Sequence, residues 1–209
     1  MSTPIEIVRL SEADFPAAAG VGARAFLDDP LFIYVLPDVG ARREKLPIFM
    51  EWATRYGHLF GEAYTTAGRV DGAAFWIPPD GGAVTPECLE ATGFGRVVEA
   101  FGVEAMARRG AVLAHLDDLH HRMMPAPHWH LIGIGVDPPR QGQGIGGQLM
   151  QPVFARADAG QLPCYLETQK ERNVPFYRRH GFDVVGETDP PRGGPHFWLM
   201  ARPPREQRR

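Results

Sequence analysis

The stretch HWHLIGIGVDPPRQGQGIGG, residues 128–147, decides the fold of this chain. Its apolar first half predicts a strand over 128–136, because short apolar runs bounded by turn residues favour strands. Two prolines then mark a loop over 137–143, and a helix is predicted over 144–160. The next apolar run, 164–168, predicts a second strand. A strand, a helix and a strand in this order predict a right-handed parallel crossover.

Turn residues divide the rest of the chain into short elements. Upstream, the pattern predicts a strand over 5–9, helices over about 11–26 and 41–60, and a hairpin of strands over 62–66 and 73–77. A helical segment interrupted by glycines is predicted over 81–124. Downstream, it predicts a short helix and two final strands, over 173–180, 182–187 and 196–201. The length fits a single domain over 1–203, and the basic tail 204–209 is expected to be disordered.

The glycine-rich run from Gln141 to Gly147 carries the strongest chemical signal. Four glycines at the start of a helix remove side chains where backbone N–H groups point outward. Those unpaired donors and the helix dipole together make an anion site suited to a pyrophosphate. A tight turn whose glycines serve only the backbone explains the loop, taken alone, equally well.

Two familiar nucleotide loops fit this run poorly. A Walker loop ends in Gly-Lys-Ser/Thr, whereas Gly146 is followed by Gly147 and Gln148. The dinucleotide spacing Gly-x-Gly-x-x-Gly is present over 142–147, with Glu167 about 20 residues further on. However, a proline-containing segment separates the strand from these glycines, and only about 60 residues remain for a doubly wound domain. These mismatches make a NAD-dependent oxidoreductase the weaker hypothesis, and it stays only as an alternative.

A third pattern, Gln/Arg-x-x-Gly-x-Gly/Ala, is met by Gln141, Gly144 and Gly146. Further motifs follow in order: Leu-Glu-Thr at 166–168, Arg-Asn-x-Pro-Phe-Tyr at 172–177, His-Gly-Phe at 180–182 and Gly-Pro-x-x-Trp-x-Met at 194–200. Together they resemble the GNAT family of N-acetyltransferases, and within it the group around puromycin N-acetyltransferase. The resemblance is strong over residues 128–203 and diffuse before them.

This resemblance implies an α+β, three-layer GNAT fold. Its mixed, mostly antiparallel central sheet would be flanked by helices and splayed between the fourth and fifth strands. Acetyl-CoA would enter that gap as co-substrate, with its diphosphate on the glycine-rich loop. The residues expected to bind it are Ile134, Gly135, Val136, Gln141, Gly142, Gln143, Gly144, Ile145, Gly146, Gly147, Asn173, Phe176 and Tyr177.

The resemblance also implies direct attack of an amine on the thioester, through a tetrahedral intermediate. It places Tyr177 near the sulfur as the acid that protonates the leaving thiolate, and the Val136 N–H would stabilise the oxyanion. Glu167 would be the general base, directly or through water. Each residue also has a structural explanation: Tyr177 as a packed aromatic, Glu167 as an ion-pair partner, and Asn173 as a helix N-cap.

A small-molecule primary amine is the expected acceptor. Asp28 and Asp29 would attract its positive charge, although Asp-Asp-Pro also ends a helix, and Trp76 and His130 are further candidates for acceptor contact. The segment 81–124 is longer than a connection needs and is expected to shape the acceptor site. An antibiotic, a polyamine, an amino acid and a peptide terminus all remain open as acceptors.

The histidines do not predict a metal. His115, His120, His121, His128 and His130 lack the spacing of a zinc motif, and no cysteine joins them. We therefore expect no metal cofactor and interpret these histidines as structural.

Composition narrows the remaining choices. A net charge of −3 argues against nucleic-acid binding, and the sequence contains neither an apolar run of about 18 residues nor a signal peptide. Cys88 and Cys164 form no disulfide framework, which favours a cytoplasmic protein without a membrane partner. Monomer and homodimer stay open. A non-catalytic acyl-CoA sensor with the same fold is the main rival to the enzyme.

Overall fold

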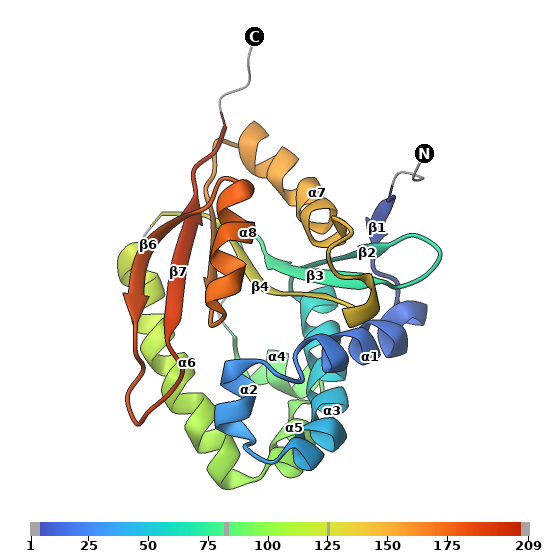
Figure 1. Cartoon of the computed structure of the whole chain (residues 1–209), viewed down its shortest axis with the longest axis vertical. Coiled ribbons are helices and arrows are strands. Elements are labelled where there is room, and N and C mark those ends of the chain that lie inside the picture. Colours follow the sequence, from blue (N-terminus) through green and yellow to red (C-terminus); the bar gives the residue numbers. More distant parts are fainter. Residues whose placement is uncertain (1–4, 82–83, 125, 206–209) are drawn as a thin grey trace.

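The computed structural model describes residues 5–81, 84–124 and 126–205. Within them a seven-stranded sheet runs in the order β1-β2-β3-β4-β5-β7-β6 (Figure 1). Its strands are β1 (Ile7–Arg9), β2 (Glu62–Thr66), β3 (Gly72–Ile77), β4 (Trp129–Val136), β5 (Cys164–Thr168), β6 (Asp183–Thr188) and β7 (Phe197–Arg202). Only β4 and β5 pair in parallel, and every other neighbouring pair is antiparallel. The expected mixed, mostly antiparallel sheet and parallel crossover are confirmed.

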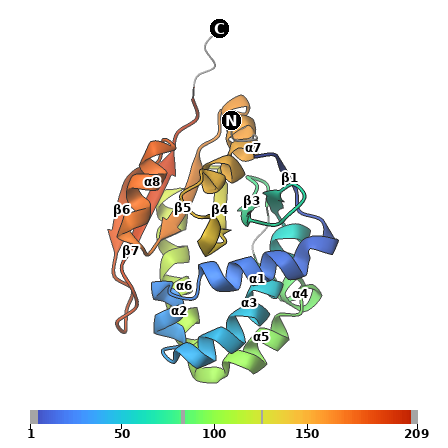
Figure 2. The same ribbon diagram turned by 45° about the vertical axis from the view of Figure 1, so that its right-hand side comes forward.

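Helices cover both faces of this sheet. The α-helices are α1 (Phe15–Ala25), α2 (Pro30–Val35), α3 (Val39–Leu59), α4 (Pro86–Ala91), α5 (Phe94–Phe101), α6 (Val103–Met123), α7 (Ile145–Ala159) and α8 (Val174–Arg179). Short 3-10 turns occupy Glu12–Asp14, Pro138–Arg140 and Glu171–Asn173. In Figures 1 and 2, α7 lies on the opposite side of β3 and β4 from α1 and α3. The result is the expected three-layer α+β arrangement.

Strands β4 and β5 separate soon after they meet. Their parallel register contains only the pairs Trp129↔Cys164 and His130↔Tyr165. Beyond them β4 continues to Val136, paired with β3 alone. Backbone groups on the β5 side of this stretch need other partners, because buried N–H and C=O groups are rarely left unpaired. The expected splay between the fourth and fifth strands is confirmed.

Strand alternation divides the residues of β4 and β5 between two cores. Leu131 and Leu166 belong to the cluster that packs against α7, where Leu149 is fully buried. Tyr165 belongs instead to the cluster under α6, with Leu116. Each buried leucine contributes about 1.5–3 kcal/mol through removal of its side chain from water. Residues neighbouring in sequence on β4 and β5 therefore face different layers.

One helix was not predicted. The segment after Asp28 is α2, with Pro30 at its first position and Asp29 as its N-cap. The Asp29 carboxylate accepts from the Leu31 N–H at 3.0 Å. The same Asp-Pro pair that ends one helix therefore starts the next, since proline is favoured at the first helical position.

Two further observations concern the ends of the chain and membranes. The Arg205 N–H donates to Asp158 at 2.8 Å, so this part of the expected disordered tail is tied to α7. Residues 206–209 of that tail lie outside the described residues. Within the described ranges, no helix has the length and apolar character needed to cross a membrane.

Candidate functional site

The glycine-rich loop joins β4 to α7 with two residues in the left-handed region. Gly142 has φ +75° and Gly144 has φ +82°, a conformation that costs other residues about 1–2 kcal/mol. Helix α7 begins at Ile145 with Gly144 as its N-cap, and no side chain caps its first turn. Its first N–H groups are therefore available to an anion.

A cleft of about 580 Å³ opens beside this loop, and we call it the glycine-loop cleft. The expected cofactor-binding residues that line it are Ile134, Gly135, Val136, Gln141, Gly142, Gly144, Ile145, Gly146, Gly147, Asn173, Phe176 and Tyr177. Gln143 does not line it, because its amide donates to the Pro139 carbonyl at 3.3 Å. The side chain of Gln143 therefore stabilises the loop, and cofactor binding by Gln143 stays a prediction.

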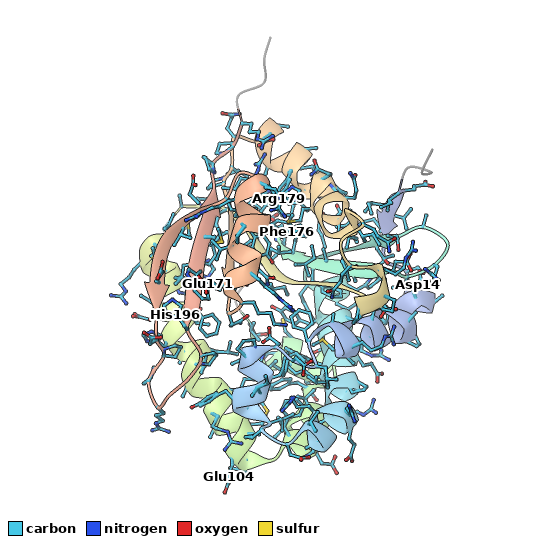
Figure 3. All side chains as sticks on the ribbon, in the orientation of Figure 1. Asp14, Glu104, Glu171, Phe176, Arg179 and His196 are labelled. Carbon is cyan, nitrogen blue, oxygen red and sulfur yellow. The ribbon has the colours of Figure 1, made fainter. Side chains whose placement is uncertain are left out.

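Four basic side chains that were not predicted also line the cleft. They are Arg140, Lys170, Arg172 and Arg179. Figure 3 shows Arg179 on α8 beside Phe176. Basic groups near an uncapped helix N-terminus suit a phosphorylated ligand. Arg140 directly precedes Gln141, and Arg172 is the first residue of the motif Arg-Asn-x-Pro-Phe-Tyr, so both basic residues were visible beside the residues that were predicted.

Two residues of the β5–α8 connection shape the wall opposite the loop. The Asn173 side-chain amide donates to the Thr168 hydroxyl at 3.1 Å, and Asn173 makes no side-chain cap to α8. Asn173 thus occupies the N-cap position of α8, but its side chain bonds to Thr168 and does not cap the helix. Phe176 approaches the loop so closely that a Cβ on Gly146 would lie 3.2 Å from its ring. Glycine at 146 leaves room for this contact.

Tyr177 lies at the inner wall of the cleft. It is only 6% exposed, and its ring packs on Phe176 and Phe182 with centroid distances of 5.1 and 5.8 Å. Burial raises the pKa of Tyr177, and the nearby charge of Asp29 raises it further. The phenol therefore stays protonated at neutral pH. Tyr177 is therefore both a packed aromatic residue and part of the cleft wall.

A second cavity of about 200 Å³ adjoins the first, and we call it the apolar pocket. Its walls are mostly aromatic and aliphatic: Val21, Phe26, Leu31, Phe32, Phe49, Met50, Phe75, Leu113, Leu116, Ile132 and Phe197. Phe26, Asp29 and Gly135 line both cavities. The apolar pocket therefore opens toward the glycine-loop cleft where β4 has parted from β5.

The two neighbouring aspartates have different environments. Asp29 is 4% exposed and lies at the junction of the cavities, with Lys170 Nζ at 3.8 Å from its carboxylate. Burial raises the pKa of Asp29, while Lys170 and backbone N–H groups oppose that effect. Asp28 is exposed and lines neither cavity. The structure thus brings Asp29 to the site and leaves Asp28 outside it.

Glu167 lines the apolar pocket and pairs with His130. The His130 Nε2 lies 2.9 Å from a Glu167 carboxylate oxygen. Burial alone would raise the pKa of Glu167, but the charge and hydrogen bond of His130, together with the charge of His120 and the nearby hydroxyl of Tyr165, outweigh it, so the pKa lies below its usual value. Glu167 is thus a largely buried carboxylate that remains ionised at neutral pH.

Trp76 lies on the wrong face of the sheet to contact the apolar pocket. It is fully buried against α7, with its ring 6.1 Å from that of Phe154. Its neighbour Phe75 faces the other way and lines the pocket. The prediction for Trp76 is corrected, because alternation and the register shift between these two residues give the pocket position to Phe75.

His120 and His128 form a cluster with His130 beside Glu167. The Nε2 atoms of His120 and His128 lie 2.6 Å apart, and the His120 ring stacks on Tyr165 at 4.5 Å. Burial and the neighbouring His130 lower the pKa of His120 to about 4. Among the described residues, no group of three or more His, Cys, Asp or Glu side chains has an arrangement suited to a metal ion. The expectation of no metal stays a prediction.

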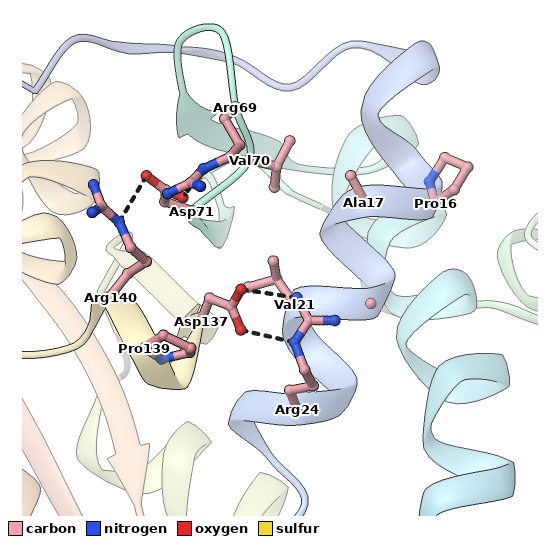
Figure 4. A pocket seen from close by; sticks show the side chains of 11 residues that line it. Pro16, Ala17, Val21, Arg24, Arg69, Val70, Asp71, Asp137, Pro139 and Arg140 are labelled. Carbon is pink, nitrogen blue, oxygen red and sulfur yellow. Dashed lines mark hydrogen bonds and ion pairs between the residues drawn. The ribbon is translucent and has the colours of Figure 1, made fainter.

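A shallower hollow lies behind the loop, between α1 and the β2–β3 turn (Figure 4). There the Arg24 guanidinium donates twice to Asp137, at 2.8 and 3.0 Å, and Arg140 donates to Asp71 at 3.2 Å. The Arg69 guanidinium also pairs with Asp71. These ion pairs tie the start of the loop to α1 and to the β2–β3 turn.

Comparison with known proteins adds independent evidence. Residues 91–182 match the model of the Acetyltransferase (GNAT) family. An uncharacterized N-acetyltransferase of Schizosaccharomyces pombe is 26% identical over 179 residues, covering 83% of this chain and 72% of the relative. The crystal structure of histone acetyltransferase HPA2 and related acetyltransferase from Corynebacterium glutamicum superposes with a TM-score of 0.71 at 24% identity, over 99% of this chain and all of that one. The chain has the GNAT fold.

Other structures with the GNAT fold agree. An agmatine N-acetyltransferase matches with a TM-score of 0.63 at 15% identity, over 94% of this chain and 98% of that one. A polyamine N-acetyltransferase of Drosophila melanogaster matches with a TM-score of 0.62 at 15% identity, over 96% and 100%. The family model and the yeast relative support N-acetyltransferase activity in general.

Proposed function

We propose that this protein transfers the acetyl group of acetyl-CoA to the primary amine of a small molecule. The junction of the two cavities carries this proposal. A cleft rich in cations and backbone donors meets an apolar pocket that holds carboxylates, and Phe26, Asp29 and Gly135 line both. Such a junction suits two ligands of opposite charge that must touch at one point.

The residues of the cleft fit the cofactor. The uncapped first turn of α7 offers backbone N–H groups to a diphosphate, and the left-handed Gly142 and Gly144 let the backbone approach it without a side chain. Arg172 and Arg179 add positive charge. Residues 134–136 of β4 offer backbone N–H and C=O groups on the side where β4 no longer pairs with β5. When bound, acetyl-CoA supplies the acetyl group as an activated thioester.

The apolar pocket receives the amine in this proposal, and helix α6 of the segment 81–124 supplies part of its wall. Glu167 and Asp29 attract the ammonium group. Because His130 keeps Glu167 ionised, that carboxylate can accept the proton that the amine must lose, directly or through a water. The amine then attacks while both groups are held in place, without a covalent enzyme intermediate.

Tyr177 and β4 complete the reaction. The buried phenol of Tyr177 keeps its proton at neutral pH and gives it to the departing thiolate. The Val136 N–H stabilises the negative charge that develops on the acetyl oxygen. A phenol with a raised pKa is a weak acid, so we expect a contribution near the lower end of general acid catalysis, about 100-fold.

Two measurements on the purified protein test this function. Acetyl-CoA should raise the melting temperature whereas NAD should not, because only a ligand of the native state stabilises it. A panel of primary amines should then include some that release thiol from acetyl-CoA. Binding of acetyl-CoA without release by any amine would point to a sensor, and stabilisation by NAD alone would favour the oxidoreductase.

The pairing of His130 with Glu167 leads to a prediction about pH. Activity requires the ionised carboxylate, so kcat/KM should fall as pH drops through the pKa of Glu167. Since His130 lowers that pKa, His130→Phe should move the acid limb of the pH profile to higher pH. His130→Gln, which can still donate a hydrogen bond, should move it less.

The control for this prediction is His115→Gln. His115 is bonded to the Thr188 hydroxyl at 2.7 Å and lines neither cavity. Its profile should match that of the unmodified protein. Identical acid limbs in His130→Phe and the unmodified protein would remove Glu167 as the titrating base.

A further inference from the structure

Arg109 is a cation on the wall of a mostly apolar pocket that also holds the carboxylates Asp29 and Glu167. It extends from α6 into the apolar pocket. Its guanidinium carbon lies 5.0 Å from the ring centroid of Phe49 and 5.7 Å from that of Trp52, both on α3. These contacts stabilise the guanidinium by cation–π attraction. They do not engage its N–H groups, which are strong hydrogen-bond donors.

Arg109 is partly buried and differs from Arg42, Arg108 and Arg202 in having no polar partner among the described residues. Arg42 donates to the carbonyls of Leu27, Leu36 and Pro37. Arg108, the adjacent residue on α6, donates to the Val35 carbonyl at 2.8 Å, and Arg202 forms two bonds to Asp158. In the part of the chain that the structure describes, Arg109 donates no hydrogen bond and has no carboxylate within 4.0 Å.

Keeping such a group costs stability. A charge removed from water without a partner is unfavourable, and burial lowers the pKa of Arg109 to about 10. The group nevertheless stays protonated at neutral pH. An uncompensated cation in a ligand-sized cavity suggests that its counter-ion comes with the ligand.

The positions of the charges orient that ligand. Asp29 lies at the junction with the glycine-loop cleft, whereas Arg109 lines the apolar pocket alone. Aromatic and aliphatic side chains such as Phe75, Phe197 and Ile132 form the remaining walls. An amine placed toward the junction would meet the Asp29 carboxylate there and Glu167 on the pocket wall, and its other end would meet apolar walls and the guanidinium of Arg109.

We infer that the acceptor is a small amine whose apolar body also carries a carboxylate, and that Arg109 binds this carboxylate. The inference rests on the proposed function and names its substrate class. It also argues against a polyamine, because a second cationic group would face the charge of Arg109. Planar guanidinium and carboxylate groups pair through two parallel hydrogen bonds, which gives Arg109 a specific role.

Pairs of amines that differ in the carboxylate provide the test. We would compare phenylalanine with 2-phenylethylamine, and 6-aminohexanoate with hexylamine, at matched concentrations of the unprotonated amine. In the unmodified protein, kcat/KM should favour the acid of at least one pair by roughly 10- to 100-fold, as expected for a charged hydrogen bond. In Arg109→Met this preference should fall to about one, with the KM for acetyl-CoA unchanged.

Two further variants control for indirect effects. Arg108→Met removes the neighbouring charge, which does not line the pocket, and should keep the preference for the acid. Arg109→Lys keeps the positive charge but lacks the planar pair of N–H donors, so it should keep only part of the preference for the acid. Arg109→Met should also have a higher melting temperature than the unmodified protein, because it removes an unpaired buried charge.

The outcomes separate this inference from the proposed function. Acetylation that favours the simple amine in both pairs, or a preference for the acid that persists in Arg109→Met, overturns the inference and leaves the acetyltransferase standing. If no amine is acetylated, the proposed function fails, and calorimetry of the same four compounds with the CoA-loaded protein decides the role of Arg109. Binding of an acid that depends on Arg109 supports that role, and no such binding overturns it.

Discussion

Gly144→Asp is expected to abolish binding of acetyl-CoA. Gly144 is the N-cap of α7 and lines the glycine-loop cleft, and no atom lies within 4 Å of a Cβ built on it. An aspartate there can cap the helix itself, so it would occupy the N–H groups that the diphosphate needs and repel its charge. Because several charged hydrogen bonds would be lost, the Kd measured by calorimetry should rise at least about 100-fold.

Gly93→Asp is the matched control for this variant. Gly93 is the N-cap of α5, has φ +75°, and likewise has open space around a built Cβ, but it lies outside the cleft. Both variants carry similar backbone strain, about 1–2 kcal/mol. Gly93→Asp should bind acetyl-CoA like the unmodified protein. Equal affinities of the two variants would contradict the role assigned to the glycine-rich loop.

Tyr177→Phe is expected to lower kcat by about 100-fold while the Kd for acetyl-CoA changes little. The ring packs on Phe176 and Phe182, and phenylalanine preserves those contacts. Only the proton donor is lost. Burial raises the pKa of Tyr177, so its deprotonation should not lower the kcat of the unmodified protein near neutral pH. Steady-state kinetics and calorimetry together separate the two effects.

Tyr56→Phe is the control for Tyr177→Phe. Tyr56 is also 6% exposed and packs on aromatic rings, Trp52 and Phe60, but it lines neither cavity. Its turnover should stay close to that of the unmodified protein. A Tyr177→Phe variant that turns over at the same rate as Tyr56→Phe would exclude Tyr177 as the acid.

Local patterns predicted the C-terminal half of the fold well. The glycines after Gln141, the alternation of β4 and the apolar face of α7 are signals that a short stretch carries by itself. The glycine loop and the parallel crossover followed from them, whereas the place of Tyr177 in the cleft followed from the resemblance to the GNAT family. Helix α2 was missed because six residues are too few to show a helical period.

The two faces of the sheet were harder to assign. Alternation says that Phe75 and Trp76 point in opposite directions, but it does not say which face holds the ligand. That choice depends on where α7 and α6 pack, and on a register shift between these two residues. The prediction therefore chose the larger aromatic residue, which belongs to the core against α7.

The sequence by itself determined the local parts of this protein: the strand, loop and helix around Gln141–Gly147, and the short helix that carries Tyr177. Only the tertiary structure decided the surroundings of Glu167 and Arg109 in the apolar pocket. His130 and Glu167 are far apart in sequence and meet because β4 and β5 pair in parallel. Arg109 looks like one more basic residue of a helix until α3 covers it with Phe49 and Trp52. Hydrogen bonding and backbone geometry act between close neighbours in the chain, whereas burial and charge pairing depend on residues that only folding brings together.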